Sequence, residues 1–488
     1  MTDSRKLNDA EIERLIRYVS DEVSHSAAPA PASGGPFTRP AHFDPGRGAG
    51  LFHDPDSAVD AALHAFEQLS EMPLERRRYI IEAMRATARE HAQVLAHFAA
   101  QETGMGRAED KVMKNLLTAN KTPGPEYLDT QAWSGDHGLT ITEYAPYGVL
   151  ASITPTTNPT STIINNSISM VSAGNAVVFN AHPGAKQCSA YTIQLLNEAI
   201  MSAGGPANLL TCVAEPTIES AQALMVHKKV KLLVVTGGAG VVRQAMQSGK
   251  RAVCAGPGNP PVVVDETADI EQAGRDIVRG GSFDNNLVCT TEKTTFAVES
   301  VVNDLVDAMT RHGAYAITSW QLRRLMKSIL AEDRGPGTYS VMNKEFIGQN
   351  ASVLLKEIGV NAGAEVRQIV AVVEPDHQLV WSEQMMPIMP VVPMPDVNAA
   401  IDLAVRSEHG FRHTAMMHSK NLDNLSRMAR EVDCSIFVKN GPCLSGLGFE
   451  GEGFTSFTIA SPTGEGLTTC RSFSRLRRCT LKDSFRIV

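Results

Sequence analysis

The segment SFDNNLVCTTEK, residues 282–293, contains one cysteine, Cys289, and no other side chain placed to complete a metal site. A cysteine in a chain of this length is usually a small core residue. The residues around it are polar, namely Asn285 and Asn286 before it and residues 290–292 after it, and we do not expect them to belong to the core. Other cysteines lie in apolar or helical contexts: Cys188, Cys212, Cys254 and Cys434. The local sequence therefore favours Cys289 as a reactive thiol.

A second segment that could contribute to a functional site is KLLVVTGGAGVVRQAM, whose pattern predicts a strand, a glycine turn and a helix. Glycines at positions 237, 238 and 240 would let the backbone approach a phosphate at the helix N-terminus, where free N–H groups and the helix dipole favour negative charge. The match to a dinucleotide-binding turn is imperfect, because Arg243 stands where the third glycine is expected. On its own, the pattern fits a simple tight turn equally well.

His409 and His413, in EHGFRHTA, have the i, i+4 spacing of a metal-binding pair. No carboxylate or thiol cluster completes such a site, so we expect no metal and treat both as pocket or structural histidines. The eight cysteines form no C-x-x-C motif and follow no secretory signal. A disulfide framework or zinc site is therefore not expected, and a reducing cytoplasm fits this cysteine usage best.

Composition narrows the class of ligand. A chain of 488 residues predicts two or three domains, and its 43% hydrophobic and 20% charged residues are ordinary for a soluble globular protein. No apolar run approaches the length of a membrane span. A net charge of −8 disfavours nucleic acid or an anionic membrane as the main partner, because both select clustered basic surfaces. Small molecules are the expected ligands.

The elements that must position these residues follow an α/β pattern. Residues 56–120 show helical spacing, and short apolar runs then alternate with helical stretches, which is typical of a doubly wound parallel sheet. We expect one such block over residues 51–258 and a second, which contains Cys289, over residues 259–440. Strand-like alternation that departs from the α/β pattern predicts a hairpin at about 134–150, within the span of the first block, and a strand in the tail, residues 441–488.

Six stretches, in matching order from about Gly50 to the C-terminus, carry a resemblance to a known family: ITPTTNPTSTIINNSISM, VSAGNAVVFNAHPGAK, AGPGNPPVVVDETADI, GGSFDNNLVCTTEK, SEQMMPIMPVV and GEGFTSFTIASPTGEG. They resemble the CoA-acylating aldehyde dehydrogenases, above all the propanediol- and ethanolamine-utilisation enzymes of bacterial microcompartments. The resemblance implies the aldehyde dehydrogenase fold, with a nucleotide-binding domain, a catalytic domain and a small β oligomerisation arm. It also implies a homodimer or homotetramer.

The family's chemistry assigns roles to two residues. By resemblance, Cys289 is the nucleophile that adds to a short-chain aldehyde, propionaldehyde or acetaldehyde. The thiohemiacetal passes hydride to NAD and becomes a thioester, which coenzyme A then accepts; sulfur suits both steps as nucleophile and leaving group. Asn158, in TPTTNPT, matches the oxyanion asparagine and would act with the backbone N–H of Cys289. The alternative for Asn158 is an ordinary Asn-Pro turn.

The resemblance also implies a set of cofactor-binding residues: Thr154, His182, Thr236, Gly237, Gly238, Gly256 and Glu383. Residues 236–238 match the pyrophosphate turn, Glu383 matches the glutamate on the nicotinamide ribose, and His182 lies in the adenosine-side segment. Asn180 stands where hydrolytic relatives have lysine, so NAD is expected and NADP is not excluded.

Two alternatives compete with the acylating enzyme. A hydrolytic aldehyde dehydrogenase needs a general base for water, carried by relatives in an E-L-G-G-K motif. Here the segment reads CAGPGNPP, with Ala255 and Gly256 in place of the acid, which favours a thiol acceptor. A non-catalytic microcompartment scaffold is disfavoured because Cys289, Asn158 and Glu383 are all present.

The N-terminus predicts a targeting element. In residues 1–23 apolar residues recur at three- and four-residue spacing and form one stripe, with charged residues such as Arg14 elsewhere around the helix. The stripe consists of Leu7, Ile12, Leu15, Ile16, Val19 and Val23. Asn8 with Glu11 forms a capping-box-like start. Residues 24–50 are rich in Ala, Pro, Gly and Ser and read as a flexible linker. Microcompartment enzymes carry such a helix and linker as an encapsulation peptide, which implies shell or cargo proteins as partners and a location inside a microcompartment. The alternative is a helix that docks on its own subunit.

Overall fold

The computed structural model describes residues 50–488. The expected encapsulation helix, residues 1–23, and the linker up to residue 49 lie outside the described residues. Within the described part, no helix is both long and apolar enough to cross a membrane.

After a short first strand, the segment for which helical spacing is expected forms four helices: α2 (Pro55–Ser70), α3 (Leu74–Glu90), α4 (Ala92–Thr103) and α5 (Ala108–Lys121). The first helix starts where Asp54 accepts a hydrogen bond from the Ser57 N–H at 2.8 Å and a proline occupies the first turn. The helix α2 packs on strands of the first sheet, whereas α3 and α5 pack on α6.

The first sheet has six parallel strands in the order β1-β6-β5-β4-β7-β8. The strands are β1 (Leu51–Phe52), β4 (Val149–Thr154), β5 (Ala176–Ala181), β6 (Leu210–Val213), β7 (Val230–Thr236) and β8 (Ala252–Ala255). The crossover helices are α6 (Pro159–Ser172), α7 (Lys186–Ser202), α8 (Ile218–Val226) and α9 (Ala239–Gln247). After β4, strands β5 and β6 are added on one side of β4, and strands β7 and β8 are added on its other side. Strand order therefore reverses between β4 and β7, where open α/β sheets bind ligands.

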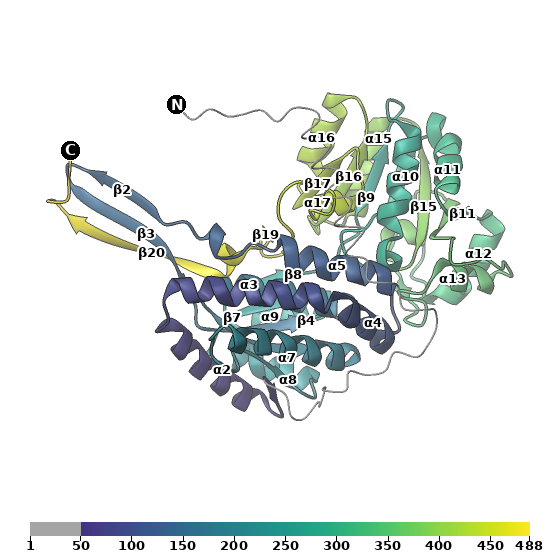
Figure 1. The fold of residues 1–488 in the computed structure, drawn as a ribbon. Coiled ribbons are helices and arrows are strands. Elements are labelled where there is room, and N and C mark those ends of the chain that lie inside the picture. Colours follow the sequence, from purple (N-terminus) through teal and green to yellow (C-terminus); the bar gives the residue numbers. More distant parts are fainter. Residues whose placement is uncertain (1–49) are drawn as a thin grey trace, which may run out of the picture. The chain divides into compact units, whose positions relative to one another are not determined.

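The second sheet has seven parallel strands in the order β11-β14-β15-β10-β9-β16-β17 (Figure 1). Its strands are β9 (Pro261–Val264), β10 (Thr294–Val298), β11 (Ala314–Ala316), β14 (Gln368–Val372), β15 (Ile388–Met394), β16 (Thr414–His418) and β17 (Ile436–Lys439). Its larger helices are α10 (Ile270–Gly281), α11 (Val302–Arg311), α12 (Ser319–Ile329), α13 (Ala351–Glu357), α15 (Val397–Ser407) and α16 (Leu422–Val432). The prediction of two α/β blocks is confirmed.

Alternating strand residues build two cores around the second sheet. Val262 and Val264 join the core that contains α10 and α11, whereas Val263 between them joins the core that contains α12, α15 and α16. Successive strand side chains point to opposite faces of a sheet. The unbroken apolar sequence of this central strand therefore reflects burial on both faces.

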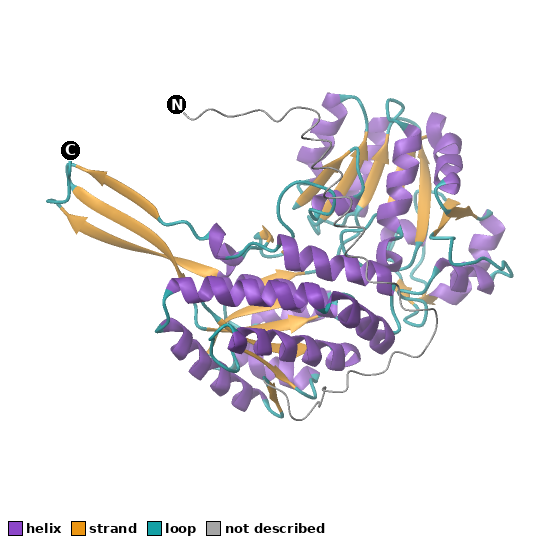
Figure 2. Cartoon of the chain, in the orientation of Figure 1, coloured by secondary structure: helices purple, strands orange, loops and turns teal. Residues whose placement is uncertain are grey.

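A third sheet is antiparallel and consists of β2 (Gln131–Gly135), β3 (Gly138–Pro146) and β20 (Ser474–Lys482), which we call the β arm (Figure 2). The hairpin was expected at about 134–150, but it begins at Gln131 and ends at Pro146. The residues that follow, β4, form a central buried strand of the first sheet. The apolar residues at 149, 150, 151 and 153 mark that strand, and Gly148, with φ of 125°, separates it from the hairpin.

Helix α10 offers a test of the packing against α11. A Cβ added to Gly274 would lie 2.6 Å from Ala308 Cβ and 2.9 Å from Met309 N, so main chain would have to move. Gly274→Ala should therefore lower the free energy of unfolding by about 1–3 kcal/mol through overpacking, although alanine favours an exposed helix by about 1 kcal/mol. Urea denaturation measures the change.

The matched control is Gly240→Ala in α9, where an added Cβ meets no atom within 4 Å. That variant should keep or gain stability. A Gly274→Ala variant that is as stable as the control would contradict the tight packing of α10 on α11.

Candidate active site

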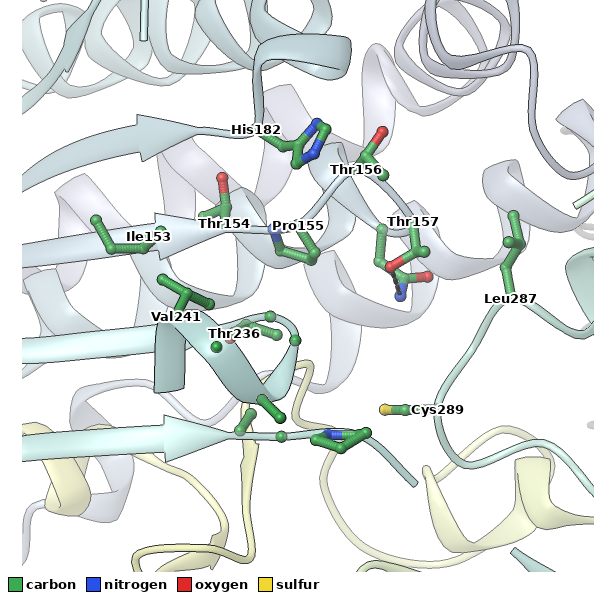
Figure 3. A pocket seen from close by; sticks show the side chains of 18 of the residues that line it. Ile153, Thr154, Pro155, Thr156, Thr157, His182, Thr236, Val241, Leu287 and Cys289 are labelled. Carbon is green, nitrogen blue, oxygen red and sulfur yellow. Dashed lines mark hydrogen bonds between the residues drawn. The ribbon is translucent and has the colours of Figure 1, made fainter. Parts of the chain in front are cut away.

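A cavity of about 980 Å³ lies at the carboxyl ends of β4, β5, β7 and β8 (Figure 3). Its walls include Thr154–Asn158 after β4, residues 237–241 after β7 and residues 255–257 at the end of β8. The facing wall comes from residues 287–289, which precede β10 of the second sheet. The cavity therefore occupies the reversal point of the first sheet and faces the segment that carries Cys289.

All nine candidate site residues line this one cavity: Thr154, Asn158, His182, Thr236, Gly237, Gly238, Gly256, Cys289 and Glu383. They come from segments up to 229 positions apart (154 to 383). Residues so far apart in the sequence are brought close together only by the fold. Their shared cavity is therefore the structural evidence that they form one site.

The glycine turn fits a phosphate-containing ligand. Gly238 is the N-cap of α9, and a Cβ added at Gly238 or Gly240 would meet no atom within 4 Å. Both glycines line the cavity, so the space beside this helix N-terminus is open. The neighbouring Thr154 Oγ1 is buried without a hydrogen-bond partner among residues 50–488. An open helix N-terminus beside an unpaired hydroxyl suits the pyrophosphate and ribose groups of a dinucleotide.

Cys289 follows an unusual stretch of backbone. Asp284, Asn285 and Asn286 have φ of 47°, 54° and 66°, so three consecutive residues are left-handed. Asp and Asn tolerate this region better than other non-glycine residues, which explains their presence here. In Figure 3 the Cys289 sulfur projects from its loop into the space in front of the strands of the first sheet.

The expectation that the flanks of Cys289 lie outside the core is wrong. Every residue from Asp284 to Asn286 and from Thr290 to Lys293 is at most 1% exposed. Several of their polar groups are hydrogen-bonded, some within the segment and some to other elements: Asn286 Nδ2 donates to the Gly281 and Glu292 carbonyls, Lys293 Nζ donates to Asn286 Oδ1 at 2.6 Å, and Asn285 Nδ2 donates to the Gly348 carbonyl. Polar residues can be buried when their hydrogen bonds are satisfied, and composition alone does not reveal this.

The pKa of the Cys289 thiol is raised above that of a free cysteine. Burial, and then the carboxylate of Glu383, raise the pKa of the Cys289 thiol to about 12, while Lys293 and Lys114 act in the opposite direction. Below that pKa the thiol form dominates. Only ligand binding or proton transfer in the site would make the thiolate abundant near neutral pH.

Two N–H groups in the site can serve an oxyanion. Asn158 begins α6, is 8% exposed and accepts a hydrogen bond from Lys114 Nζ through its Oδ1 at 2.7 Å. Its Nδ2 donates to Thr157 Oγ1 at 3.2 Å, which leaves one amide hydrogen. The backbone N–H of Cys289 donates to no backbone carbonyl within residues 50–488. These donors belong to segments on the two sides of the cavity.

Sequence reasoning missed the charged residues behind this site, which are Lys111, Lys114 and Asp284. The two lysines lie three positions apart on α5, in a helix whose lysines would ordinarily be assigned to the surface. Their i, i+3 spacing, which puts them on one face of the helix, was the available signal. Nothing in the sequence indicated that this face is buried.

The acid content of the cavity is low. Of the described residues that line it, Glu383 alone carries a carboxylate. Burial raises the pKa of Glu383, although Lys293 opposes this. Ala255 and Gly256 line the wall where hydrolytic enzymes were expected to place a general base.

The two histidines lie apart from any metal-binding group. His413 is buried near Gly258, and burial together with Lys293 lowers its pKa to about 4, so it is neutral at pH 7. His409 Nε2 contacts the Trp381 carbonyl at 2.8 Å, and its ring packs against Phe411. Residues 50–488 contain no group of three or more His, Cys, Asp or Glu side chains arranged to hold a metal ion.

Comparison with known proteins identifies the family of the chain. Residues 52–453 match the model of the aldehyde dehydrogenase family. Acetylating acetaldehyde dehydrogenase EutE of Salmonella typhimurium is 45% identical over 485 residues, covering 99% of this chain and 100% of the relative. The resemblance on the sequence is thus confirmed.

Two solved structures agree. Propionaldehyde dehydrogenase of Rhodopseudomonas palustris, with bound CoA and an acylated cysteine, is 44% identical with a TM-score of 0.86, covering 89% of this chain and 98% of the other. Propionaldehyde dehydrogenase from the Clostridium phytofermentans fucose utilisation bacterial microcompartment is 45% identical with a TM-score of 0.87, covering 90% and 100%. The chain therefore belongs to the aldehyde dehydrogenase family.

Proposed function

We propose that this protein is a CoA-acylating aldehyde dehydrogenase, which converts a short-chain aldehyde and coenzyme A to acyl-CoA with a nicotinamide cofactor. The observation that carries the proposal is the combination of Cys289 and the Asn158 amide at a cavity whose wall has Ala255 and Gly256 in place of a general base. The relatives named as acetylating acetaldehyde dehydrogenase and propionaldehyde dehydrogenase, one with CoA bound, support it.

In the first half-reaction, the Cys289 thiolate adds through Sγ to the aldehyde carbon, and the carbonyl becomes a thiohemiacetal oxyanion. Asn158 Nδ2 and the Cys289 N–H donate to this oxyanion. Oxidation of the carbon leaves an acyl group on Sγ as a thioester. In the second half-reaction the CoA thiolate adds to this thioester, the same two donors hold the second oxyanion, and the Cys289 thiolate leaves.

The nicotinamide cofactor accepts two electrons and one proton as hydride when it is bound. Thr236, Gly237 and Gly238 would hold its pyrophosphate at the start of α9, and Thr154 and Gly256 would line its path across the cavity. Glu383 would orient the nicotinamide ribose, and His182 would contact the adenosine side. NAD is the proposed cofactor, with NADP as the alternative, since Asn180 replaces the lysine of hydrolytic relatives.

The substrate is proposed to be a small alkyl aldehyde. The wall of the cavity that contains Cys289 includes apolar side chains, among them Leu287, Val288, Leu447 and Phe457. Such walls hold an alkyl chain but discriminate one methylene by only about 1–3 kcal/mol. Acetaldehyde and propionaldehyde are both retained as substrates.

The surroundings of the enzyme are also proposed. The exposed edges of the β arm, strands β2 and β20, are suited to pairing between subunits in a homodimer or a tetramer of dimers. Residues 1–23 are proposed to bind microcompartment shell or cargo proteins, with residues 24–50 as the linker. A relative from a microcompartment supports this location. We assign nucleotide binding to residues 51–258, catalysis to residues 259–440, and the return segment and arm strand to residues 441–488.

Product analysis separates acyl transfer from hydrolysis. Purified enzyme with aldehyde and NAD should form NADH in no more than one equivalent per active site until CoA is added, because the site lacks an activated water. With CoA, turnover should resume and acyl-CoA should match NADH. Full-rate NADH formation without CoA, with free acid accumulating, would establish the hydrolytic alternative instead.

Cys289→Ala should reduce CoA-dependent NADH formation by at least about 1,000-fold, since loss of a covalent nucleophile removes the thioester route. The matched control is Cys434→Ala, a half-buried cysteine outside the cavity lining, which should retain near-wild-type turnover. Circular dichroism checks that both variants fold. Undiminished turnover in Cys289→Ala would rule out this cysteine as the nucleophile.

Deletion of residues 1–23 should leave the kcat/KM of the purified enzyme unchanged and abolish its co-purification with shells. The finer test changes one face of the predicted helix: Leu15→Asp, on the apolar stripe, should block encapsulation, whereas Arg14→Asp, on the polar side, should not. Shell fractionation of a fluorescent fusion measures both. Equal encapsulation of all variants would show that the enzyme is recruited in another way.

A further inference from the structure

Two lysines of α5 share one buried carboxylate. Lys111 and Lys114 are each 2% exposed, and both ammonium groups contact Asp284 Oδ2, Lys111 at 3.0 Å and Lys114 more closely. The other oxygen, Oδ1, accepts a hydrogen bond from the Arg107 N–H at 2.8 Å. One carboxylate therefore faces two cations, and the cluster carries a net positive charge.

Stability alone does not account for the second lysine. Burial opposes ionisation of Asp284, but Lys111 and Lys114 hold the pKa of its carboxyl below the usual value, so it is charged at neutral pH. Burial lowers the pKa of Lys114 to about 8, despite the attraction of Asp284. A buried ion pair already repays its desolvation poorly, and a further cation adds desolvation and repulsion from Lys111. A function for Lys114 would explain why it is present.

The contact that distinguishes the two lysines is with Asn158. Lys114 Nζ lies 2.7 Å from Asn158 Oδ1, whereas Lys111 Nζ, besides its contact with Asp284, donates to the Thr157 carbonyl at 3.4 Å. An ammonium group donates hydrogen bonds and cannot accept them. The amide oxygen of Asn158 must therefore face Lys114, and Nδ2 must face the opposite way.

We propose that Lys114 is a positioning residue that fixes the orientation of the Asn158 amide and polarises its N–H toward the oxyanions of both half-reactions. This rests on the proposed function. Without Lys114 the amide could rotate and present Oδ1, which would repel an oxyanion. A positive charge on the oxygen side also strengthens the Nδ2 donor, because hydrogen bonds in a chain polarise one another.

The test compares Lys114→Met with Lys111→Met. Each variant removes one buried cation and leaves Asp284 paired with the other lysine, so the two are matched in burial and charge. Lys114→Met should lower kcat by about 10- to 100-fold, somewhat less than the loss of a whole oxyanion donor, with the aldehyde KM changed by less than about threefold. Lys111→Met should keep kcat within about threefold of wild type.

Two further measurements separate positioning from structural damage. Alkylation of Cys289 by iodoacetamide forms no oxyanion, so its rate should fall by less than about threefold in Lys114→Met, reflecting only the lost cation near the thiolate. In an Asn158→Ala background, adding Lys114→Met should lower kcat by less than about threefold, because the group through which Lys114 acts is absent. If Lys114→Met does not fold, Lys114→Leu, which also removes both the donor and the charge, takes its place with the same expectations.

Equal losses of kcat in the two methionine variants, or a Lys114→Met loss of the same size in the Asn158→Ala background, would overturn the positioning role. So would alkylation that falls in parallel with kcat. Failure of the proposed function is seen separately, since wild-type enzyme would then lack CoA-dependent NADH formation while alkylation of Cys289 remained measurable.

Discussion

The buried carboxylate of Asp284 is the interaction on which the active-site geometry depends. Asp284 joins helix α5 to the turn before Cys289. Its carboxylate binds Lys111 and Lys114, and its backbone N–H donates to the Asp110 carboxylate at 2.8 Å. Asp110 in turn pairs with Arg367 at 2.7 Å, which extends the network to the start of β14. Through Lys114 the same carboxylate is connected to Asn158. The nucleophile and the amide donor, on opposite sides of the cavity, thus share one fixed reference.

This network also explains how a strained backbone is kept in place. A left-handed φ costs about 1–3 kcal/mol for most side chains and less for Asn and Asp. Such residues therefore persist only where neighbouring contacts hold the backbone in place. Asn285 Nδ2 donates to the Gly348 carbonyl at 2.8 Å, and its Oδ1 accepts from Arg107 Nε at 3.1 Å. The side chains of the turn therefore bond to three separate segments. Such a turn presents Cys289 at one position, as an enzyme requires of a nucleophile that must meet fixed donors.

Much of the fold could be predicted because its signals are local. Apolar runs such as 232–235 in the first sheet and 261–264 in the second, separated from neighbouring runs by helical stretches, indicated the two parallel sheets, and the glycines at 237 and 238 indicated the turn before α9. The buried polar network could not be predicted, because its bonds join residues far apart, such as Lys114 and Asp284, which are 170 positions apart. Polarity around Cys289 suggested exposure, whereas the partners that bury it lie in other elements. The family resemblance supplied candidate roles, and the structure supplied their proximity.

The third strand of the β arm has a consequence for how the chain is made. Arg475 in β20 bonds to Pro146 at the end of β3, 329 positions earlier in the sequence. A ribosome adding about 5–20 residues per second needs about 20–60 s to synthesise the intervening chain. Throughout that interval one edge of β3 emerges without its partner, although the first sheet, complete by Ala255, can already form. The nascent protein therefore exposes an unpaired strand edge until β20 has been synthesised, and this is the period in which chaperones or a neighbouring nascent copy have access to it.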